Sequence, residues 1–238
     1  MTTHIVTMGG GGFSTSPNGA ATKLDKYVVD LAGKPNPVVA FLPTASADDP
    51  RYINRFLTAY GALGIRPIVA TLWHDAARSV SRLAEADVIV VGGGLTVNLI
   101  ALWDAHGVSG RIRELVRSDR NLVIAGYAAG GGAFYEGCTT DSFGPIRAWR
   151  GGLGVLPGSF CSHYNSEDDR APIFAEAIGE GSLHNGYGVD DGAAIHWVDG
   201  TAKHFLAEDT ESRVYRVETT DEPTSTGVYI NAERMRLL

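Results

Sequence analysis

The chain has 238 residues, with 20 lysines and arginines against 27 aspartates and glutamates and a formal net charge of −7. Nucleic acids and anionic membranes bind basic surfaces, so this acidic balance argues against either one as a partner. Hydrophobic residues make up 44% and charged residues 20% of a chain that is long enough to bury a core, which excludes a disordered protein.

Short apolar runs rich in β-branched residues recur through the first two thirds of the chain. Each run is apolar almost throughout, which is typical of strands that are buried on both faces of a parallel sheet. The predicted strands are His4–Met8, Val38–Leu42, Ile68–Leu72, Asp87–Val91 and Asn121–Ala125.

Segments with apolar residues at helical spacing lie between these strands. They are Leu24–Leu31 before Gly33, Ile53–Tyr60 after Asp49-Pro50, and Ile112–Val116. Alternating strands and helices form right-handed βαβ units, so we expect an α/β fold with a doubly wound, mostly parallel sheet.

The texture of the sequence changes after about Trp149, where turn-rich stretches separate short strand-like runs. Ala193–Val198, Lys203–Leu206 and Arg213–Val217 are predicted to form a C-terminal antiparallel extension of the same unit. Because no linker or internal repeat interrupts the chain, residues 1–238 are expected to form a single domain.

The N-terminal residues lack the basic and apolar regions of a signal peptide, and the apolar stretch around Val88–Val91 is too short to span a membrane. Cys138 and Cys161 do not have the spacing of a metal site and are expected to be free thiols in a reducing compartment. The sequence therefore predicts a cytoplasmic protein that uses no metal and no cofactor.

Three glycine clusters follow predicted strands: Gly9–Gly12, Gly92–Gly94 and the run from Gly126 to Gly132. Loops at the carboxyl ends of parallel strands form a ligand crevice, and glycine there lets the backbone approach the ligand closely. The dinucleotide pattern G-x-G-x-x-G fails because Ser14 and Val97 stand where its last glycine belongs, and no P-loop occurs. A nucleotide site is therefore not expected.

The third cluster begins Gly126-Tyr127-Ala128-Ala129-Gly130, directly after a predicted strand. It matches the nucleophile elbow G-x-S-x-G at every position except the centre. Small residues two before and two after the centre permit a sharp turn that exposes the central side chain and aims backbone N–H groups at its reaction partner. Here the centre is Ala128, whose methyl group cannot attack a carbonyl.

The elbow is one of four segments that occur in order: Phe41–Ala45, Ala86–Thr96, Ala125–Gly130 and Ser162–Tyr164. They resemble the second strand, the A-D-x-I-x-x-G-G-G-N-T block, the G-[WY]-S-A-G-A elbow and the P-H-[FY] run of the aspartyl dipeptidase (peptidase E) family of serine peptidases, which includes cyanophycinase relatives. The resemblance spans about residues 38 to 195. It implies a glutamine-amidotransferase-like, flavodoxin-like fold and small peptide substrates, and it allows a homodimer.

The resemblance implies a set of catalytic positions in the chain order serine, histidine, acid. The nucleophile position is Ala128, the general base is His163, and the acid is Asp191, where the family has glutamate. Asp141 is the reserve candidate for the acid. In such a set the histidine takes the proton of the hydroxyl, and the carboxylate orients the imidazole.

The tetrahedral intermediate also needs two hydrogen-bond donors for its oxyanion. The resemblance places them at the N–H of Ala129 and at an N–H of the Gly93–Leu95 loop, with Gly94 as the candidate. Leu95 stands where the family has asparagine, so the loop departs from the family pattern.

Arg170 matches an arginine that the family uses to read the N-terminal aspartate of the substrate, since a guanidinium binds a carboxylate through two hydrogen bonds. The residues around it differ from the family pattern, which leaves a broader dipeptidase selectivity equally open. Asp169 is predicted to cap a helix that begins here, with Pro172 in its first turn.

Two explanations of Ala128 compete: a Ser→Ala substitution in an active dipeptidase, or a natural pseudoenzyme that binds small peptides or amino acids. The retained glycine turn, base and acid favour the substitution. In either case the chain is expected to be inactive or severely impaired. A third hypothesis, a glutamine-amidotransferase-like enzyme, needs a cysteine at the elbow, and Cys138 lies too far along the chain.

Overall fold

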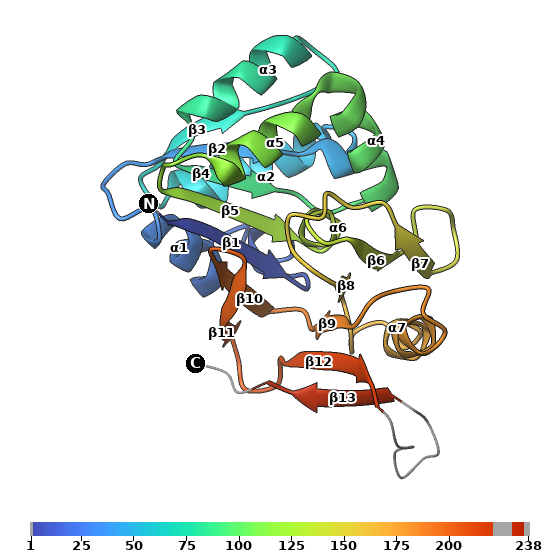
Figure 1. Cartoon of the computed structure of the whole chain (residues 1–238). Coiled ribbons are helices and arrows are strands. Elements are labelled where there is room, and N and C mark those ends of the chain that lie inside the picture. The colour runs from blue at the N-terminus through green and yellow to red at the C-terminus, as the bar shows by residue number, and fades with distance from the viewer. Residues whose placement is uncertain (1, 221–229, 236–238) are drawn as a thin grey trace.

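The computed structural model describes residues 2–220 and 230–235 and contains two β-sheets (Figure 1). In these residues the first sheet has seven strands in the order β11-β10-β1-β5-β4-β2-β3. Five of the strands are parallel, and β10 and β11 add to them in antiparallel fashion. The strands are β1 (Thr3–Met8), β2 (Val38–Leu42), β3 (Arg66–Val69), β4 (Val88–Val91), β5 (Leu122–Tyr127), β10 (Ala193–Val198) and β11 (Thr201–Ala207).

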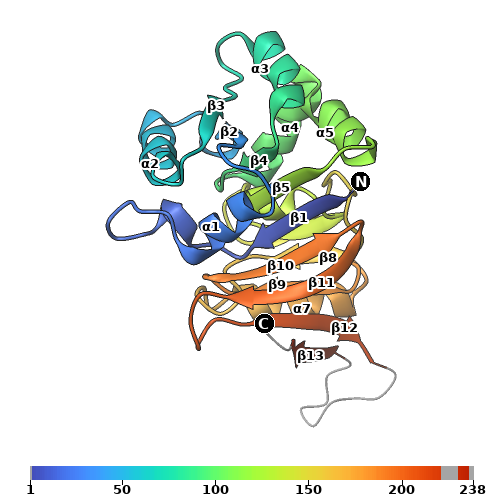
Figure 2. The ribbon, with the colours of Figure 1, turned by 90° about the vertical axis from the view of Figure 1, so that its left-hand side faces the viewer.

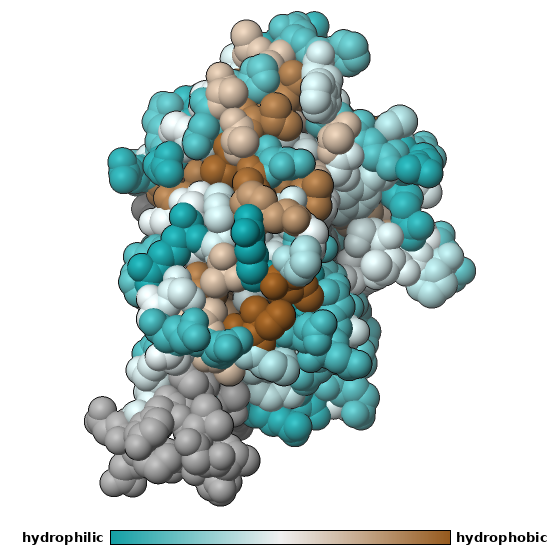
Figure 3. Space-filling view, turned by 90° about the vertical axis from the view of Figure 1, so that its right-hand side faces the viewer, coloured by the Kyte–Doolittle hydropathy of each residue, from teal (hydrophilic) through white to brown (hydrophobic). Residues whose placement is uncertain are grey.

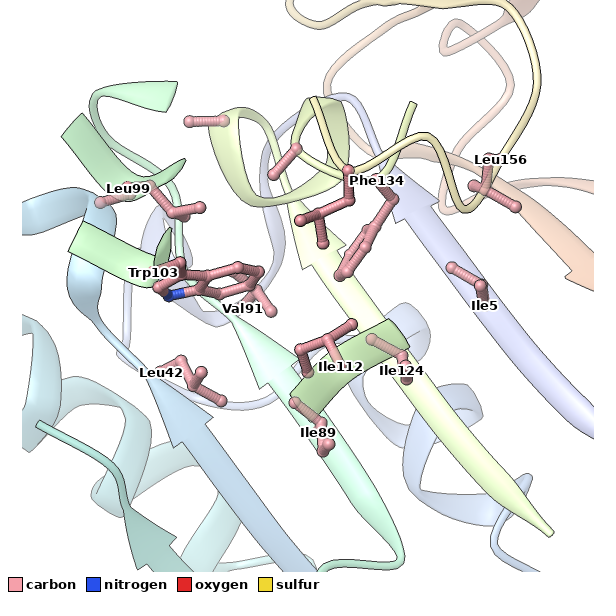
Figure 4. Packing of buried hydrophobic residues seen from close by; sticks show 14 of the residues in the cluster. Ile5, Leu42, Ile89, Val91, Leu99, Trp103, Ile112, Ile124, Phe134 and Leu156 are labelled. Atoms are coloured by element: carbon pink, nitrogen blue, oxygen red, sulfur yellow. The ribbon is translucent and has the colours of Figure 1, made fainter. Parts of the chain in front are cut away.

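Helices cover both faces of the first sheet. Alternate residues of each strand point to opposite faces, so two hydrophobic clusters form. One cluster joins the sheet to α1 and α2, and the other joins it to α4 and α5, with Trp103 and Ile112 packed over Val91, Ile89 and Ile124 (Figure 4). The helices are α1 (Lys23–Asp30), α2 (Pro50–Gly61), α3 (Ala76–Arg82), α4 (Thr96–His106) and α5 (Val108–Arg117).

The second sheet lies below the first in Figures 1 and 2 and has the order β13-β12-β9-β8-β6-β7. Its central strands β6, β8 and β9 are parallel, while β7, β12 and β13 run antiparallel to their neighbours. Helix α7 packs on this sheet around Phe174 and Ile178. The elements are β6 (Gly137–Thr140), β7 (Arg147–Arg150), β8 (Ser159–Cys161), α7 (Arg170–Gly179), β9 (Gly186–Val189), β12 (Val214–Thr219) and β13 (Ile230–Arg234).

The predicted α/β fold with a mostly parallel, doubly wound sheet is confirmed. The sequence analysis foresaw only part of the C-terminal region, because Ala193–Val198 does extend the first sheet but the strand predicted at Arg213–Val217 belongs to the second. Strands β8 and β9 were missed. They are three and four residues long, and glycine occupies two of the four positions of β9, so neither shows the apolar run that marks a buried strand.

Smaller points of the sequence analysis also have an outcome. Cys138 and Cys161 are free thiols, as predicted. Both are also buried, and burial raises the pKa of both thiols to about 12. The prediction that Asp169 caps α7 is wrong in one respect: it occupies the N-cap position, but its side chain makes no capping hydrogen bond. Among the described residues, no helix is long and apolar enough to cross a membrane.

Candidate active site

The strand β5 ends at Tyr127, and the short helix α6 (Ala129–Gly132) begins two residues later (Figure 1). Ala128 lies between them with φ 46° and ψ −110°, a conformation that a residue with a side chain rarely adopts. The flanking glycines make the turn sterically possible. A Cβ on Gly126 would lie 2.4 Å from the carbonyl oxygen of Gly130, and a Cβ on Gly130 would lie 2.5 Å from that of Val91.

Hydrogen bonds on both sides hold this turn in place. The N–H of Ala128 donates to the carbonyl of Met8 at the end of β1 over 2.9 Å, and its own carbonyl accepts from the N–H of Gly132. The Cβ of Ala128 faces the loop after β4, since a Cβ on Gly93 would lie 3.6 Å from it. The first sheet therefore presents the side chain at position 128 to the Gly93–Leu95 loop.

Two backbone N–H groups beside Ala128 are available to a ligand. In the Gly93–Leu95 loop, the N–H of Gly93 donates to the hydroxyl of Tyr52 over 3.2 Å, and that of Leu95 donates to the carbonyl of Ala45 over 2.9 Å. Within residues 2–220 and 230–235, the N–H groups of Gly94 and Ala129 have no hydrogen-bond partner. These are the two donors that the sequence analysis named.

The second sheet brings a histidine and an aspartate to the same place. His163 follows β8 and Asp191 follows β9, and Nδ1 of the histidine lies 2.6 Å from Oδ1 of the aspartate. The hydrogen bond from the His163 ring is the main reason why the pKa of Asp191 lies below its usual value. Because Nδ1 is engaged by the carboxylate, Nε2 is the ring nitrogen left for proton transfer.

The glycine loop after β1 holds these two residues together. The N–H of His163 donates to the carbonyl of Gly9, and the N–H of Gly192 donates to that of Gly10, each over 3.2 Å. Gly10 packs so closely that an added Cβ would lie 1.9 Å from Oδ1 of Asp191 and 2.5 Å from Cε1 of His163. Any side chain at position 10 would displace the His163–Asp191 pair.

A cavity of about 190 Å³, here called the elbow cavity, unites these parts. Its lining comes from both sheets and consists of Gly94, Thr96, Ala128, Ala129, Thr139, Thr140, Asp141, Ser162, His163, Glu167 and Arg170. Arg170 is 4% exposed, and its Nε donates to Glu167 over 2.8 Å. Its two Nη atoms have no hydrogen-bond partner among the described residues, so the guanidinium can still bind an anion in the cavity.

The two candidate acids lie in different places relative to His163. Asp141 lines the elbow cavity and is exposed, and no hydrogen bond joins it to His163 in the described part of the chain. Asp190, the neighbour of Asp191, is buried and has a structural role. It accepts hydrogen bonds from the backbone N–H groups of Asn165 and Arg213, and burial raises its pKa. The geometry thus pairs His163 with Asp191.

Residues 5–205 match the family described as peptidase family S51. The chain belongs to peptidase family S51. It is 39% identical over 215 residues to the uncharacterized peptidase YgaJ of Bacillus subtilis (strain 168). The match covers 90% of this chain and 91% of YgaJ.

Two solved structures share the S51 chain's fold. A peptidase from an acI-B1 Actinobacterium matches with a TM-score of 0.67 and 14% identity, covering 100% of this chain and 95% of the other. A protein from Listeria monocytogenes EGD-e assigned to peptidase E matches with a TM-score of 0.60 and 15% identity, covering 99% of this chain and 100% of the other. At this identity the likeness concerns the fold alone.

Sequence reasoning missed several groups that complete the site of this S51 chain. Gly10 was noted only as one member of a cluster, and its tight contact with the His163–Asp191 pair depends on how the two sheets meet. Glu167 forms an ion pair with Arg170 that could not be foreseen before the helix was placed. Tyr52 carries no local signal, since it comes from α2. In the described residues, no group of three His, Cys, Asp or Glu side chains is arranged to hold a metal ion.

Proposed function

We propose that this S51 chain has the scaffold of a serine-type dipeptidase in which Ala128 occupies the nucleophile position. One observation carries the proposal. Ala128 keeps the strained backbone conformation of a nucleophile elbow, φ 46° and ψ −110°, in a cavity that His163 also lines. A residue held at such a cost to the backbone is typical of functional sites, and no alanine side chain requires it.

With serine at position 128, the groups of the elbow cavity account for each proton transfer. The hydroxyl attacks the peptide carbonyl while Nε2 of His163 takes its proton, and the same proton then passes to the leaving amine. Asp191 fixes the ring tautomer through Nδ1 and stabilises the imidazolium. Water repeats the sequence on the acyl-enzyme and releases the first residue.

The oxyanion formed during each attack would accept from the N–H groups of Gly94 and Ala129. Both are free of partners in the described structure, and both line the elbow cavity with Ala128. Donors of this kind are fixed before the reaction begins, and removal of one typically lowers the rate by roughly 10²–10³-fold.

The charged wall of the elbow cavity is suited to the N-terminal residue of a short peptide. Glu167 and Asp141 offer carboxylates to its ammonium group, and the Nη atoms of Arg170 offer donors to an acidic side chain. N-terminal aspartate is therefore an acceptable first residue. The Glu167 carboxylate offsets part of the Arg170 charge, which favours a preference that is weaker than strict aspartyl specificity.

The chain as it stands has no hydroxyl at position 128, so we expect it to bind peptides but to cleave them very slowly or not at all. A triad without its nucleophile retains only about 10³–10⁴-fold acceleration over water. The alternative proposal, a pseudoenzyme that uses the same cavity as a receptor, differs in one respect. It predicts that a serine at position 128 confers no activity.

The test compares the chain with its Ala128→Ser variant on a panel of Asp-X, Met-X and Gly-X dipeptides, with release of amino acids followed by mass spectrometry. The serine variant should cleave, and His163→Ala in that background should abolish the activity. EDTA should leave the rate unchanged, since the proposed mechanism uses no metal. A silent serine variant that still folds and binds peptides would favour the receptor instead.

A further inference from the structure

A second hollow adjoins the elbow cavity on the other side of the oxyanion loop. It has a volume of about 590 Å³, and Gly94 lines both hollows. We call this hollow the apolar groove. Its lining consists of Thr44, Ala45, Ser46, Ala47, Trp73, Gly94, Leu95, Asn98, Ala101 and Leu102, from the loops after β2, β3 and β4 and from α4.

The apolar groove has the opposite chemistry to the elbow cavity. In the part of the chain that the structure describes, no charged side chain lines the groove, whereas Asp141, Glu167 and Arg170 line the elbow cavity. Trp73 is 59% exposed and Leu95 is 38% exposed, so two large hydrophobic side chains face solvent here. Figure 3 shows the side of the molecule nearest to α4 in Figure 1, and hydrophobic residues gather across its upper half. Exposed apolar surface beside a polar site marks a place where a ligand is bound.

The walls of the apolar groove are fixed by hydrogen bonds rather than by a ligand. The Asp48 carboxylate accepts from the N–H groups of Leu72 and Trp73 over 2.7 and 3.3 Å, which holds the tryptophan loop. The opposite wall is held by the N–H of Leu95, which donates to the carbonyl of Ala45 over 2.9 Å. A preformed apolar surface of this kind can bind a side chain without first paying the entropy of ordering itself.

We propose that the apolar groove binds the side chain of the residue that follows the scissile bond, and that the S51 chain therefore selects peptides with an apolar residue at that position. The inference rests on the proposed function, because the N–H of Gly94 is taken as the donor to the scissile carbonyl. Gly94 lies between the two hollows, so a peptide whose carbonyl is bound there has one residue beside each.

Charge decides which of the two peptide residues binds in the elbow cavity and which binds in the apolar groove. The N-terminal residue carries an ammonium group, and only the elbow cavity offers carboxylates to it, from Glu167 and Asp141. The residue after the scissile bond carries no ammonium, so its side chain can enter an uncharged groove while the chain beyond it stays in solvent. Burial of an apolar side chain excludes water from both partners and stabilises the complex.

Leu95 then acts as a specificity-determining residue. It stands where the resemblance described above has asparagine, and its side chain lines the apolar groove while its backbone belongs to the oxyanion loop. A leucine at this position makes one wall apolar without changing the donor at Gly94.

The first experiment measures kcat/KM of the Ala128→Ser variant for Ala-Leu, Ala-Gly, Asp-Leu and Asp-Gly. Leucine should be preferred over glycine at the second position by roughly 10- to 100-fold, whichever residue comes first. Trp73→Ala and Leu95→Asn should each reduce this preference by about tenfold. Leu57→Ala serves as the matched control, because Leu57 is 39% exposed on α2 and lines neither hollow.

The second experiment needs no turnover and uses the chain with Ala128. Titration calorimetry should show that Ala-Leu binds more tightly than Ala-Gly. Because the sequence has four tryptophans, a shift of the fluorescence to shorter wavelength that Ala-Leu alone causes is assigned to Trp73 by its loss in Trp73→Ala. Trp73→Ala should abolish the difference in affinity, and Leu57→Ala should preserve it. This readout supports or overturns the groove even where the serine variant is silent.

The outcomes separate the two proposals. Cleavage of both peptides at equal rates, insensitive to Trp73→Ala, would leave the peptidase proposal standing and overturn the groove. No cleavage by the serine variant would overturn the peptidase proposal, and the calorimetric preference would then decide the groove alone. A preference for leucine at the first position, tested with Leu-Ala against Gly-Ala, would overturn the assignment of the apolar groove to the residue after the scissile bond. A dimer that Trp73→Ala dissociates would show a second copy in the groove and would overturn it as well.

Discussion

The two sheets contribute different kinds of group to the elbow cavity. The first sheet contributes backbone: the turn at Ala128 and the N–H groups of Gly94 and Ala129, which have no partner among the described residues. The second sheet contributes side chains, namely His163, its partner Asp191, and Arg170 from the helix α7 that packs on it. Steric requirements fix the first contribution, whereas the position of one sheet against the other fixes the second.

This difference predicts how substitutions will act. A change in the first sheet's turn should damage folding, because the glycines there are in contact with backbone atoms that cannot move. A change in the second sheet's pair should damage catalysis in the serine variant while the fold survives. The four predictions below run from the largest effect expected at neutral pH to the smallest.

Asp191→Asn in the Ala128→Ser background should lower kcat by about 10⁴-fold, because an asparagine stabilises the wrong tautomer of the His163 ring and cannot stabilise the imidazolium. Steady-state kinetics on the best dipeptide of the panel measures the effect. Asp141→Asn in the same background is the rival variant. A larger loss from Asp141→Asn would transfer the role of the acid to that residue.

Gly126→Ala should destabilise the chain by roughly 3 kcal/mol or more, since its Cβ would lie 2.4 Å from the carbonyl oxygen of Gly130. Urea unfolding followed by circular dichroism measures the free energy of unfolding. Gly110→Ala is the matched control: it lies in α5 with open space around it and should stabilise the chain by about 0.5–1 kcal/mol. Equal stability of the two variants would contradict the steric account of the turn.

Gly10→Ala should lower the activity of the serine variant by roughly 10²-fold, because its Cβ must push Asp191 or His163 aside and a displacement of about 1 Å is enough for such a loss. The hydrogen bonds of Gly10 are made by its backbone and are retained, so the variant should still fold. Kinetics and urea unfolding on the same sample separate the two effects. Full activity would mean that the glycine loop does not position the pair.

The last effect is absent at neutral pH and concerns β1 and β10 of the first sheet, where Nε2 of His196 lies 2.9 Å from Nδ1 of His4, and Nδ1 of His196 lies 2.7 Å from the hydroxyl of Tyr27. Burial is the main reason that the pKa of His196 is lowered to about 4. As the pH falls below 6.5, His196 takes up a proton in the unfolded chain but not in the folded chain. Its contribution to the free energy of unfolding is therefore fully present above pH 6.5 and is lost as the pH drops toward 4.

For this single group the unfolding equilibrium constant should rise by up to about tenfold per pH unit between pH 6.5 and 4. His196→Gln should remove this part of the pH dependence of stability in urea unfolding experiments at several pH values. His74→Gln, at an exposed histidine elsewhere in the chain, should retain it. A slope unchanged by His196→Gln would contradict the prediction.

The sequence predicted those features that depend on local pattern. The five parallel strands and the helices around α1, α2 and α5 follow from apolar periodicity, and the turn at Ala128 follows from the spacing of Gly126 and Gly130. Strand Arg66–Val69 was predicted to begin two residues late and to end three residues late. The end was misplaced because Leu72 is apolar and buried but lies outside the strand. Periodicity records burial, and burial extends into loops.

What the sequence could not predict depends on contacts between distant segments. Strands β8 and β9 of the second sheet are only three and four residues long and show no apolar run, so no periodic signal marks them. The contact of Gly10 with the His163–Asp191 pair joins the loops after β1, β8 and β9. The apolar groove likewise takes Trp73 and Leu102 from segments with no common motif.

The state of the two cysteines has a practical consequence for chemical labelling. Cys138 and Cys161 are the only thiols in the sequence, and both are buried with pKa values of about 12, so alkylating reagents at neutral pH find almost no thiolate in the native protein. A cysteine placed at position 128 by Ala128→Cys would be half-buried and would line the elbow cavity together with His163. Iodoacetamide or an electrophilic peptide would then alkylate the sulfur at position 128 selectively. A covalent probe could thus be attached at the elbow without any change to the rest of the chain.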